Sequence, residues 1–378
     1  MTPPAIGIAG SYGGLNRGDE AILTSMLAAL RGRLPGAELT VFSRNAEDTR
    51  ARHQVDRVIP VRELTRDIVA TDVERLDLLL LGGGGILHDG EARMYLREVL
   101  LAQERGIPTM AYAVGAGPLE DRQEREGTRR ALSGMQAITV RDAGARRLLE
   151  DIGVERPITV TADPALLLEP ERFVLEQLES EGIATHRPLV GLSIREPGTA
   201  APDLDVDAYA TVLAHTADFV VDRFGADVVF IPMERIDIRL SHDVISRMTH
   251  AEHAEVLRGD YRPAQLLGLM EHLDFVIATR LHVIIFAALS GTPFVPLRYA
   301  AKVGEFVRTL GVPAPVAVTR DSAGALLAAV DRAWDERHLE RARLCEAVLA
   351  ARRRSQQTLE LALELLSVKA PGAGLAVA

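Results

Sequence analysis

Side chains able to do chemistry gather at the ends of predicted strands in the second half of the chain. Residues 274–291 have the pattern of a strand, a polar turn and a helix, which places Arg280 on the turn and His282 on the first helical turn. A helix N-terminus favours anions, and the near-neutral pKa of an imidazole suits proton transfer. A lone histidine is more often structural, but the neighbouring Arg280 favours an anion site with an acid–base group.

Lysine is nearly absent from this chain, although basic residues are common. Of the 43 Lys and Arg residues, only Lys302 and Lys369 are lysines. Because an ammonium and a guanidinium differ in shape and acidity, a retained lysine is a candidate for a role that arginine cannot fill. Lys369 lies in a loose tail, where chance explains it. Lys302 follows the predicted strand 293–297, so we expect it to bind a ligand.

Two further arginines lie at strand ends in opposite halves of the chain. Arg141 follows the predicted strand 138–140, and Arg195 closes the segment 191–195. The alternative for each is an ordinary surface salt bridge. If these two cations meet Arg280 and Lys302 in one cleft, they suit a ligand with two negative groups, such as a phosphorylated carboxylate.

Glycine-rich turns follow three predicted strands in the first half, at residues 10–18, 82–85 and 115–118. Glycine lets the backbone approach a ligand closely, so we expect Gly83 and Gly84 to contact substrate. A single such turn is as easily a tight connection, but three at one sheet edge favour a cleft. We also expect Asp19 to cap the helix that follows the first turn.

Nucleotide-binding signatures are missing from these turns. The first turn lacks the glycine spacing of the dinucleotide fingerprint, and no acidic residue follows the second strand at the position that binds ribose. The chain also has no P-loop motif. A nicotinamide-dependent dehydrogenase is therefore disfavoured.

Strands and helices alternate along the chain, which predicts two Rossmann-like α/β domains with ligands in the cleft between them. The predicted strands lie at residues 5–9, 39–43, 76–81, 109–114, 138–140 and 158–161, and then at 189–194, 227–231, 275–278 and 293–297. We predict an N-terminal domain over 1–170, a C-terminal domain over 185–366 that ends in a long helical region, and a flexible tail over 369–378.

Composition narrows the function classes. The net charge of −10 argues against a nucleic-acid-coating surface, and the single cysteine, Cys345, excludes an intramolecular disulfide or a cysteine zinc site. The N-terminal segment does not resemble a signal peptide, and no apolar run has the length of a membrane span. We therefore expect a cytoplasmic protein.

Taken together, the motifs resemble the polysaccharide pyruvyl transferase family. They occur in order, with sensible spacing, over nearly the whole chain: the turn and helix start at 10–21, the glycines 82–85, the segments Val-Arg-Asp at 140–142, Ala-Asp-Pro at 162–164 and Arg-Leu-His at 280–282, and Tyr-x-x-Lys-Val at 299–303. The family is similar to the two-domain GT-B architecture, and its members transfer the enolpyruvyl group of phosphoenolpyruvate onto a sugar as a pyruvate ketal.

The resemblance implies roles for particular residues. Arg141, His282 and Lys302 match the positions that contact phosphoenolpyruvate, while Tyr12 and Asn16 match the N-terminal loop of the active site. We hypothesise that His282 is the general acid and that the two cations hold the anion. The chemistry requires no metal and no cofactor besides this co-substrate. The implied acceptor is a lipid- or nucleotide-linked sugar, which is consistent with weak association with the inner membrane face; the oligomeric state is left open.

An acidic pair after the strand 227–231 stands where the family often has a polar stretch with a downstream acid. Glu234 replaces the more usual amide, and Asp237 follows it. We expect both to lie near the acceptor, and either is a candidate base for a sugar hydroxyl. A solvated acidic turn is the alternative.

Two other functions fit the same architecture. The first is a GT-B nucleotide-sugar glycosyltransferase, which Lys302, Arg141 and His282 argue against because they suit a small dianion. The second is a non-catalytic module that binds glycans or nucleotides. It predicts that a His282→Ala variant keeps its ligand affinity and that no turnover is seen.

Overall fold

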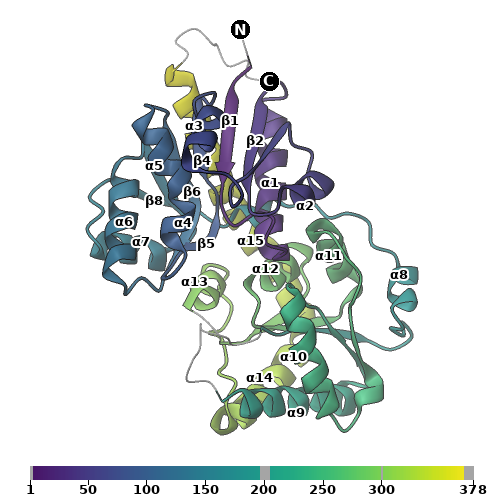
Figure 1. Cartoon of the computed structure of the whole chain (residues 1–378). Helices are drawn as coiled ribbons and strands as arrows, with labels where there is room; N and C mark the ends of the chain where they lie inside the picture. The colour runs from purple at the N-terminus through teal and green to yellow at the C-terminus, as the bar shows by residue number, and fades with distance from the viewer. Residues whose placement is uncertain (1–2, 196–204, 299–300, 370–378) are drawn as a thin grey trace. The chain divides into compact units, whose positions relative to one another are not determined.

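The computed structural model describes residues 3–195, 205–298 and 301–369, which form two compact units (Figure 1). The first unit contains the described residues up to Leu168 together with those from Arg352 onward. The second unit runs from Glu169 to Ala351. Each unit has its own apolar core. The predicted flexible tail lies largely outside the described residues.

The first unit is built on a parallel sheet in the order β3-β2-β1-β4-β6-β7-β8, with β5 paired to β6. Residues 78–81 are four consecutive buried leucines, as expected for a strand that helices cover on both faces. The strands are β1 (Ala5–Ala9), β2 (Glu38–Ser43), β3 (Arg57–Pro60), β4 (Leu78–Leu81), β5 (Gly84–Leu87), β6 (Thr109–Ala116), β7 (Ala137–Val140) and β8 (Ile158–Val160).

Helices connect most of these strands along the chain. They are α1 (Arg17–Arg33), α2 (Ala46–Arg52), α3 (Arg66–Val73), α4 (Ala92–Tyr95), α5 (Arg97–Glu104), α6 (Arg122–Ser133) and α7 (Ala143–Asp151). The strands β3 and β5 were not predicted from the sequence.

The second unit has a smaller parallel sheet in the order β11-β10-β9-β12-β13. Its strands are β9 (Leu189–Ser193), β10 (Asp227–Phe230), β11 (Ala254–Val256), β12 (Phe275–Ala278) and β13 (Phe294–Pro296). Its helices are α8 (Leu175–Ser180), α9 (Val206–Phe224), α10 (Arg235–Ser246), α11 (Pro263–Leu269), α12 (Leu281–Ser290), α13 (Ala301–Thr309) and α14 (Ala323–Asp335).

Both sheets reverse their strand order at one point, and these points position the candidate sites. In the first unit the reversal lies between β1 and β4, and in the second between β9 and β12. Loops that leave such neighbouring strands diverge to opposite faces of the sheet, which opens a crevice at the carboxyl edge. The residues after these four strands are therefore the natural place for a ligand.

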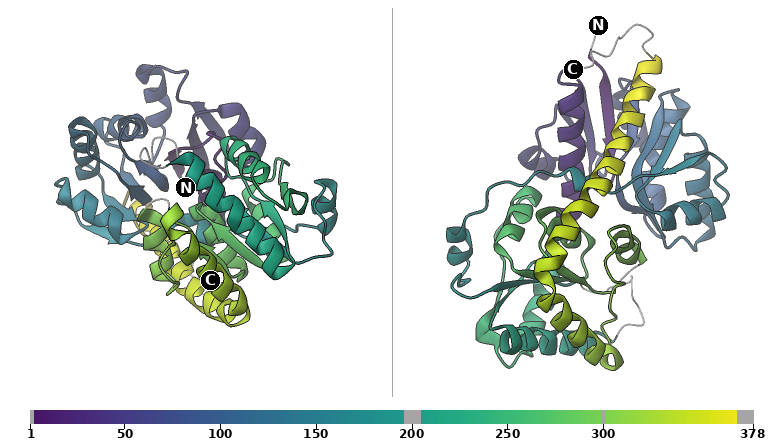
Figure 2. Two further views of the ribbon diagram at one scale, coloured as in Figure 1. Left: turned by 90° about the horizontal axis from the view of Figure 1, so that it is seen from below. Right: turned by 180° about the vertical axis from the view of Figure 1, so that it is seen from behind.

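The last helix corrects the predicted domain boundary. α15 (Arg337–Lys369) is one continuous helix, but its residues from Arg352 belong to the first unit rather than to a C-terminal domain that ends at 366 (Figure 2). Polar contacts explain the assignment, because the hydroxyl of Ser355 donates to the carbonyl of Asp163 at 3.2 Å and that of Thr358 bonds to Thr161 at 2.7 Å. A helical pattern alone does not show which core a helix completes.

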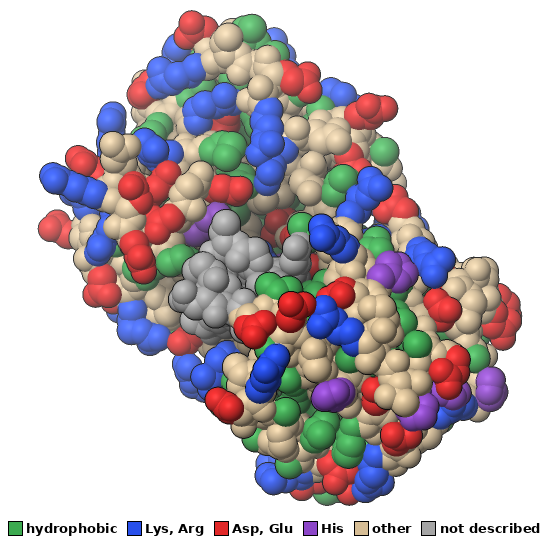
Figure 3. Space-filling view, turned by 60° about the horizontal axis from the view of Figure 1, so that its bottom comes forward, with side chains coloured by type: hydrophobic (Ala, Val, Ile, Leu, Met, Phe, Trp, Pro, Cys, Tyr) green, Lys and Arg blue, Asp and Glu red, His purple; other side chains and the backbone are tan. Residues whose placement is uncertain are grey.

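The surface agrees with the acidic but mixed composition. On the face in Figure 3, basic and acidic side chains are interspersed, with no extended area of one charge over the described residues. None of the described helices combines the length and apolar character required to cross a membrane.

Candidate functional site

Arg280 is the centre of an ion cluster at the carboxyl edge of the second sheet. It follows β12 directly and is the N-cap residue of α12, with its side chain only 7% exposed. Its Nη2 atom donates to Glu234 Oε2 at 3.1 Å and also to Asp237. Both acids come from the start of α10, so the loops after β10 and β12 are held together by one guanidinium.

Asp237 supports this cluster and is not a solvated acid. Its side chain is fully buried, and its Oδ2 atom accepts hydrogen bonds from the backbone amides of Met233 and Glu234, at 3.0 and 3.1 Å. Because its oxygens are engaged by these amides and by Arg280, it cannot serve as the predicted substrate contact. Asp237 instead orients Arg280.

Glu234 is the accessible carboxylate of the cluster, with 27% of its side chain exposed. Burial alone would raise its pKa, but the charge of Arg280, followed by those of Arg195 and Lys302, lowers the pKa below the ordinary value of 4.5. Burial would likewise lower the pKa of Arg280, yet the Asp237 and Glu234 carboxylates raise it. The structure thus brings together the three predicted cations of this unit.

The ends of β9 and β12 are tied together beside this cluster. The backbone amide of Arg195, two residues beyond β9, donates to the hydroxyl of Thr279 at 2.9 Å. His282 is the second residue of α12 and is half-buried, within one helical turn of Arg280. The predicted placement of His282 on the first turn of a helix is confirmed.

The first unit places a single buried arginine at its sheet edge. Arg141 follows β7, its side chain is 6% exposed, and its Nη1 atom donates to Asp163 Oδ2 at 3.0 Å. A Cβ atom added at Gly115 would lie 2.8 Å from both Nε and Nη2 of this guanidinium, and one at Gly85 would lie 3.3 Å from Nη2. Glycine at these positions leaves room for Arg141, a role that the sequence pattern did not reveal.

The predicted contacts through Gly83 and Gly84 are not supported by their surroundings. Both residues are buried, Gly83 against Pro164 and Ile22, and Gly84 beside Asp19 with a φ of +101°. They pack β5 against α1, so close packing explains their lack of a side chain. The exposed glycine of this turn is Gly85, next to Arg141.

The Tyr12 hydroxyl points into the protein. The residue is fully buried, and its hydroxyl lies 3.5 Å from the sulfur of Met26. Burial, together with the nearby Asp19 and Glu20, raises its pKa well above the ordinary value, so the hydroxyl stays protonated near neutral pH. Tyr12 fills the space beneath the glycine turn, and its substrate-binding role stays a prediction.

Asn16, rather than Asp19, caps α1. Its side-chain oxygen accepts from the amide of Gly18 at 2.9 Å, and the helix begins at Arg17. A buried pair braces the same loop: Glu20 Oε1 accepts from the amide of Gly13 at 2.9 Å, and its Oε2 lies 2.7 Å from Nε2 of His53. Asn16 remains near the predicted site, but its side chain has a structural task.

The site residues thus fall into two groups. Arg195, Glu234, Asp237, Arg280 and Lys302 share the edge of the second sheet, and Arg141 lies at the edge of the first. The meeting of these groups in one cleft stays a prediction, as does the absence of a metal or cofactor requirement. Sequence reasoning missed Gly115 and Asp163, although Asp163 lies in the Ala-Asp-Pro motif at 162–164.

Two parallel α/β units, each with a strand-order reversal and with charged side chains at the carboxyl edge of its sheet, have the architecture of the GT-B fold. Solved structures agree: a putative UDP-N-acetylglucosamine 2-epimerase from Listeria monocytogenes aligns over 93% of this chain and 94% of its own, with a TM-score of 0.64 and 11% identity. The UDP-GlcNAc 2-epimerase from Neisseria meningitidis bound to UDP-GlcNAc aligns over 96% and 100%, with a TM-score of 0.61 and 11% identity. HepE from Anabaena in complex with UDP aligns over 97% and 100%, with a TM-score of 0.63 and 14% identity.

Sequence comparison is more specific than the fold. Residues 16–300 match the family described as polysaccharide pyruvyl transferase, and the chain belongs to that family. No curated protein matches the chain. The matched span includes Arg141, Arg280 and His282, and Lys302 lies just beyond it.

Proposed function

We propose that this enzyme transfers the enolpyruvyl group of phosphoenolpyruvate onto two hydroxyls of a sugar in a cell-surface polysaccharide precursor, with release of phosphate. Membership of the polysaccharide pyruvyl transferase family supports the reaction class. The observation that carries the choice of co-substrate is the cluster at the second sheet edge, where Arg195, Arg280 and Lys302 share one accessible carboxylate, Glu234. Several cations at a partly buried edge suit a small, highly charged anion.

The reaction balances without an added oxidant or metal. The methylene carbon of phosphoenolpyruvate gains a proton and becomes the ketal methyl group, which leaves an oxocarbenium-like centre at the neighbouring carbon. Two sugar oxygens form bonds to that carbon, and its bond to the phosphate oxygen breaks. Of the two hydroxyl protons, one balances the proton given to the methylene and the other leaves with hydrogen phosphate.

Each role falls to a residue whose chemistry suits it. His282 delivers the proton to the methylene, since an imidazole can both donate and recover a proton near neutral pH. Lys302 and Arg141 bind the phosphate and carboxylate and stabilise the charge on the departing phosphate. Glu234, ionised at neutral pH because its pKa is lowered, accepts a hydrogen bond from an acceptor hydroxyl. Asp237 keeps Arg280 in place.

A phosphate-release assay tests the reaction. The full chain is incubated with phosphoenolpyruvate and either lipid-linked or nucleotide-linked amino sugars, and the product is examined by mass spectrometry for a pyruvate ketal. Release of phosphate that depends on the acceptor supports the proposal. Consumption of a nucleotide sugar without phosphoenolpyruvate would replace it with glycosyl transfer.

Substitution of His282 separates catalysis from binding. We expect His282→Ala to lower kcat by about 10²–10⁴-fold, the usual contribution of a general acid, while phosphoenolpyruvate still binds. The matched control is His215→Ala, which removes an exposed histidine of α9 in the same unit and should leave kcat unchanged. If the His282 variant keeps full activity, that residue is not the acid.

A further inference from the structure

A pocket opens at the carboxyl edge of the first sheet, within the first unit. Its volume is about 480 Å³, within the usual range for small-molecule sites. The ends of β1, β2 and β3 form one side, and α4 and the start of α5 form the other. Neither Arg141 nor the glycines at 82–85 line it, so it is distinct from the group around that arginine.

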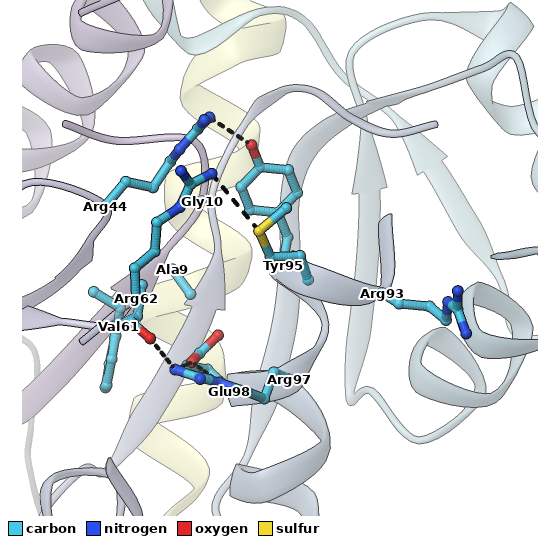
Figure 4. Close-up of a pocket in the computed structure, with 11 residues that line it drawn as sticks. Ala9, Gly10, Arg44, Val61, Arg62, Arg93, Tyr95, Arg97 and Glu98 are labelled. Atoms are coloured by element: carbon cyan, nitrogen blue, oxygen red, sulfur yellow. Dashed lines mark hydrogen bonds and ion pairs between the residues drawn. The ribbon is translucent and has the colours of Figure 1, made fainter. Parts of the chain in front are cut away.

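Two of the arginines at this pocket have no carboxylate partner among the residues that the structure describes. Arg44 Nη1 donates to the hydroxyl of Tyr95 at 3.0 Å and to that of Ser11 at 3.3 Å. Arg62 Nη2 approaches only the sulfur of Met94, at 3.7 Å. Within the described ranges no Asp or Glu oxygen lies within ion-pair distance of either guanidinium, and Figure 4 shows the Arg44 side chain extending toward Tyr95.

The other two arginines at this pocket form ion pairs with carboxylates of the protein. Arg93 turns away from the group in Figure 4, and its Nε donates to Glu124 at 3.1 Å. Arg97 bonds to Glu98 at 2.6 Å and to the carbonyl of Val61 at 2.8 Å. These charges are neutralised inside the protein, whereas those of Arg44 and Arg62 are available to a ligand.

Tyr95 and Glu98 also line the pocket, and apolar side chains supply most of the remainder. Ala9 and Phe42 are buried beneath the pocket, and Val61 and Met94 stand at its side. The Glu91 carboxylate accepts a hydrogen bond from the Tyr95 hydroxyl at 2.8 Å. It is therefore linked to Arg44 only through Tyr95. A ligand that fits has phosphate oxygens for two guanidiniums and an apolar or planar part beside them.

We infer that this pocket binds the diphosphate group of the acceptor, with Arg44 and Arg62 contacting the phosphates. The inference rests on the proposed function, which needs a sugar carried on a soluble or lipid anchor. Nucleotide-linked and lipid-linked sugars share a diphosphate ester next to an apolar or planar group, and it is this shared chemistry that the pocket recognises.

Binding without turnover provides the test. Calorimetric titration of the full chain with UDP and, separately, with farnesyl diphosphate measures the affinity for a nucleotide-linked and a lipid-linked diphosphate. Uridine, which lacks the phosphates, is the control ligand. We expect one of the diphosphates to bind and uridine not to bind. Arg44→Ala and Arg62→Ala should each weaken that binding about tenfold or more, the usual effect of losing a hydrogen bond to a charged group.

Matched controls keep the outcome decisive. Arg75→Ala removes an exposed arginine before β4, at the opposite edge of the sheet, and should leave binding unchanged. Because neither Arg44 nor Arg62 is buried, thermal unfolding should confirm that their variants fold. Unchanged affinity in the Arg44→Ala/Arg62→Ala double variant, equal loss in Arg75→Ala, or no binding of either diphosphate at millimolar concentration would overturn the inference.

The two proposals fail in different ways. If the enzyme releases phosphate but the acceptor KM is the same in the double variant, the pocket has another purpose and the reaction stands. If the diphosphate binds through these arginines but phosphoenolpyruvate is never consumed, the binding site stands and the reaction is wrong.

Discussion

The two sheets have the same strand order around their reversal points, but their carboxyl edges carry different kinds of residue. At the first edge, glycine-rich turns follow β1 and β4, and the buried cation Arg141 follows β7. At the second, between β9 and β12, the chain places several cations against two carboxylates. A shared topology therefore determines where a ligand can lie, and the residues after the strands determine whether the edge supplies space or charge.

This difference predicts how each edge fails. The first edge is sensitive to volume, because the Arg141 guanidinium lies against two glycines with no room for a Cβ atom at Gly115. The second edge is sensitive to charge, because Arg280 is held between Glu234 and Asp237 in a setting where an unpaired ion is costly. Substitutions that change volume alone, or charge alone, should separate the two.

Loss of the buried acid at the second edge should have the largest effect. Asp237→Ala leaves the Arg280 guanidinium without its buried partner and two backbone amides without their acceptor. Breaking a buried pair from one side typically costs about 3–5 kcal/mol of unfolding free energy. Urea unfolding followed by circular dichroism measures it. Asp243→Ala on the same helix, which breaks an exposed pair with Arg247, is the control and should cost about 1 kcal/mol or less.

The matching change at the first edge adds volume and leaves charge alone. In Gly115→Ala the new Cβ atom would stand 2.8 Å from Arg141 Nε, so the guanidinium must shift. A displacement on the order of 1 Å at a binding group costs about 100-fold, and we expect kcat/KM to fall by that factor. Gly32→Ala, whose Cβ meets no atom within 4 Å, should leave activity intact. Equal activity in both variants would show that Arg141 does not need its present position.

The sequence predicted the second edge better than the first. Arg280, Arg195 and Lys302 were identified because alternating strands and helices place the residues after parallel strands at one edge, and the structure brings these residues together. Charge on a strand end is visible in a sequence. The sequence does not show whether the Asp237 side chain points inward to Arg280 or outward to water, because side chains on the first turn of a helix can point in both directions.

The first edge depended on packing that no local pattern shows. The glycine-rich turn suggested a ligand contact for Gly83, and the family resemblance suggested one for Tyr12, but the structure buries both. Glycine leaves space that another part of the chain can fill, and which part fills it follows from tertiary structure. The return of residues from Arg352 to the first unit has the same cause, since helical periodicity does not specify a partner.

The brace beneath the first loop gives an intermediate prediction. Glu20 is 3% exposed and joins the amide of Gly13 to the ring of His53. Glu20→Gln keeps the size but weakens a charge-assisted bond, so we expect a loss of about 1–3 kcal/mol and faster hydrogen exchange at the Gly13 amide. Glu47→Gln, which changes an exposed acid of α2, should change neither. Slow exchange at Gly13 in the Glu20 variant would show that the loop is held by other contacts.

The smallest effect on stability should come from substitution of Glu234, the accessible acid of the second edge. The pH dependence of this effect reports on the charges around Glu234. Arg280, Arg195 and Lys302 lower the pKa of Glu234, so the folded protein holds this carboxylate ionised where the unfolded chain begins to bind a proton. Its contribution is thus complete above the ordinary pKa of 4.5 and is lost as the pH falls through the lower folded value. We expect the unfolding free energy of the wild type to exceed that of Glu234→Gln by about 1 kcal/mol or less at neutral pH. This difference should shrink as the pH falls. Urea unfolding of both proteins across that range measures it, and a difference that stays constant into acid would mean that the three cations do not act on Glu234.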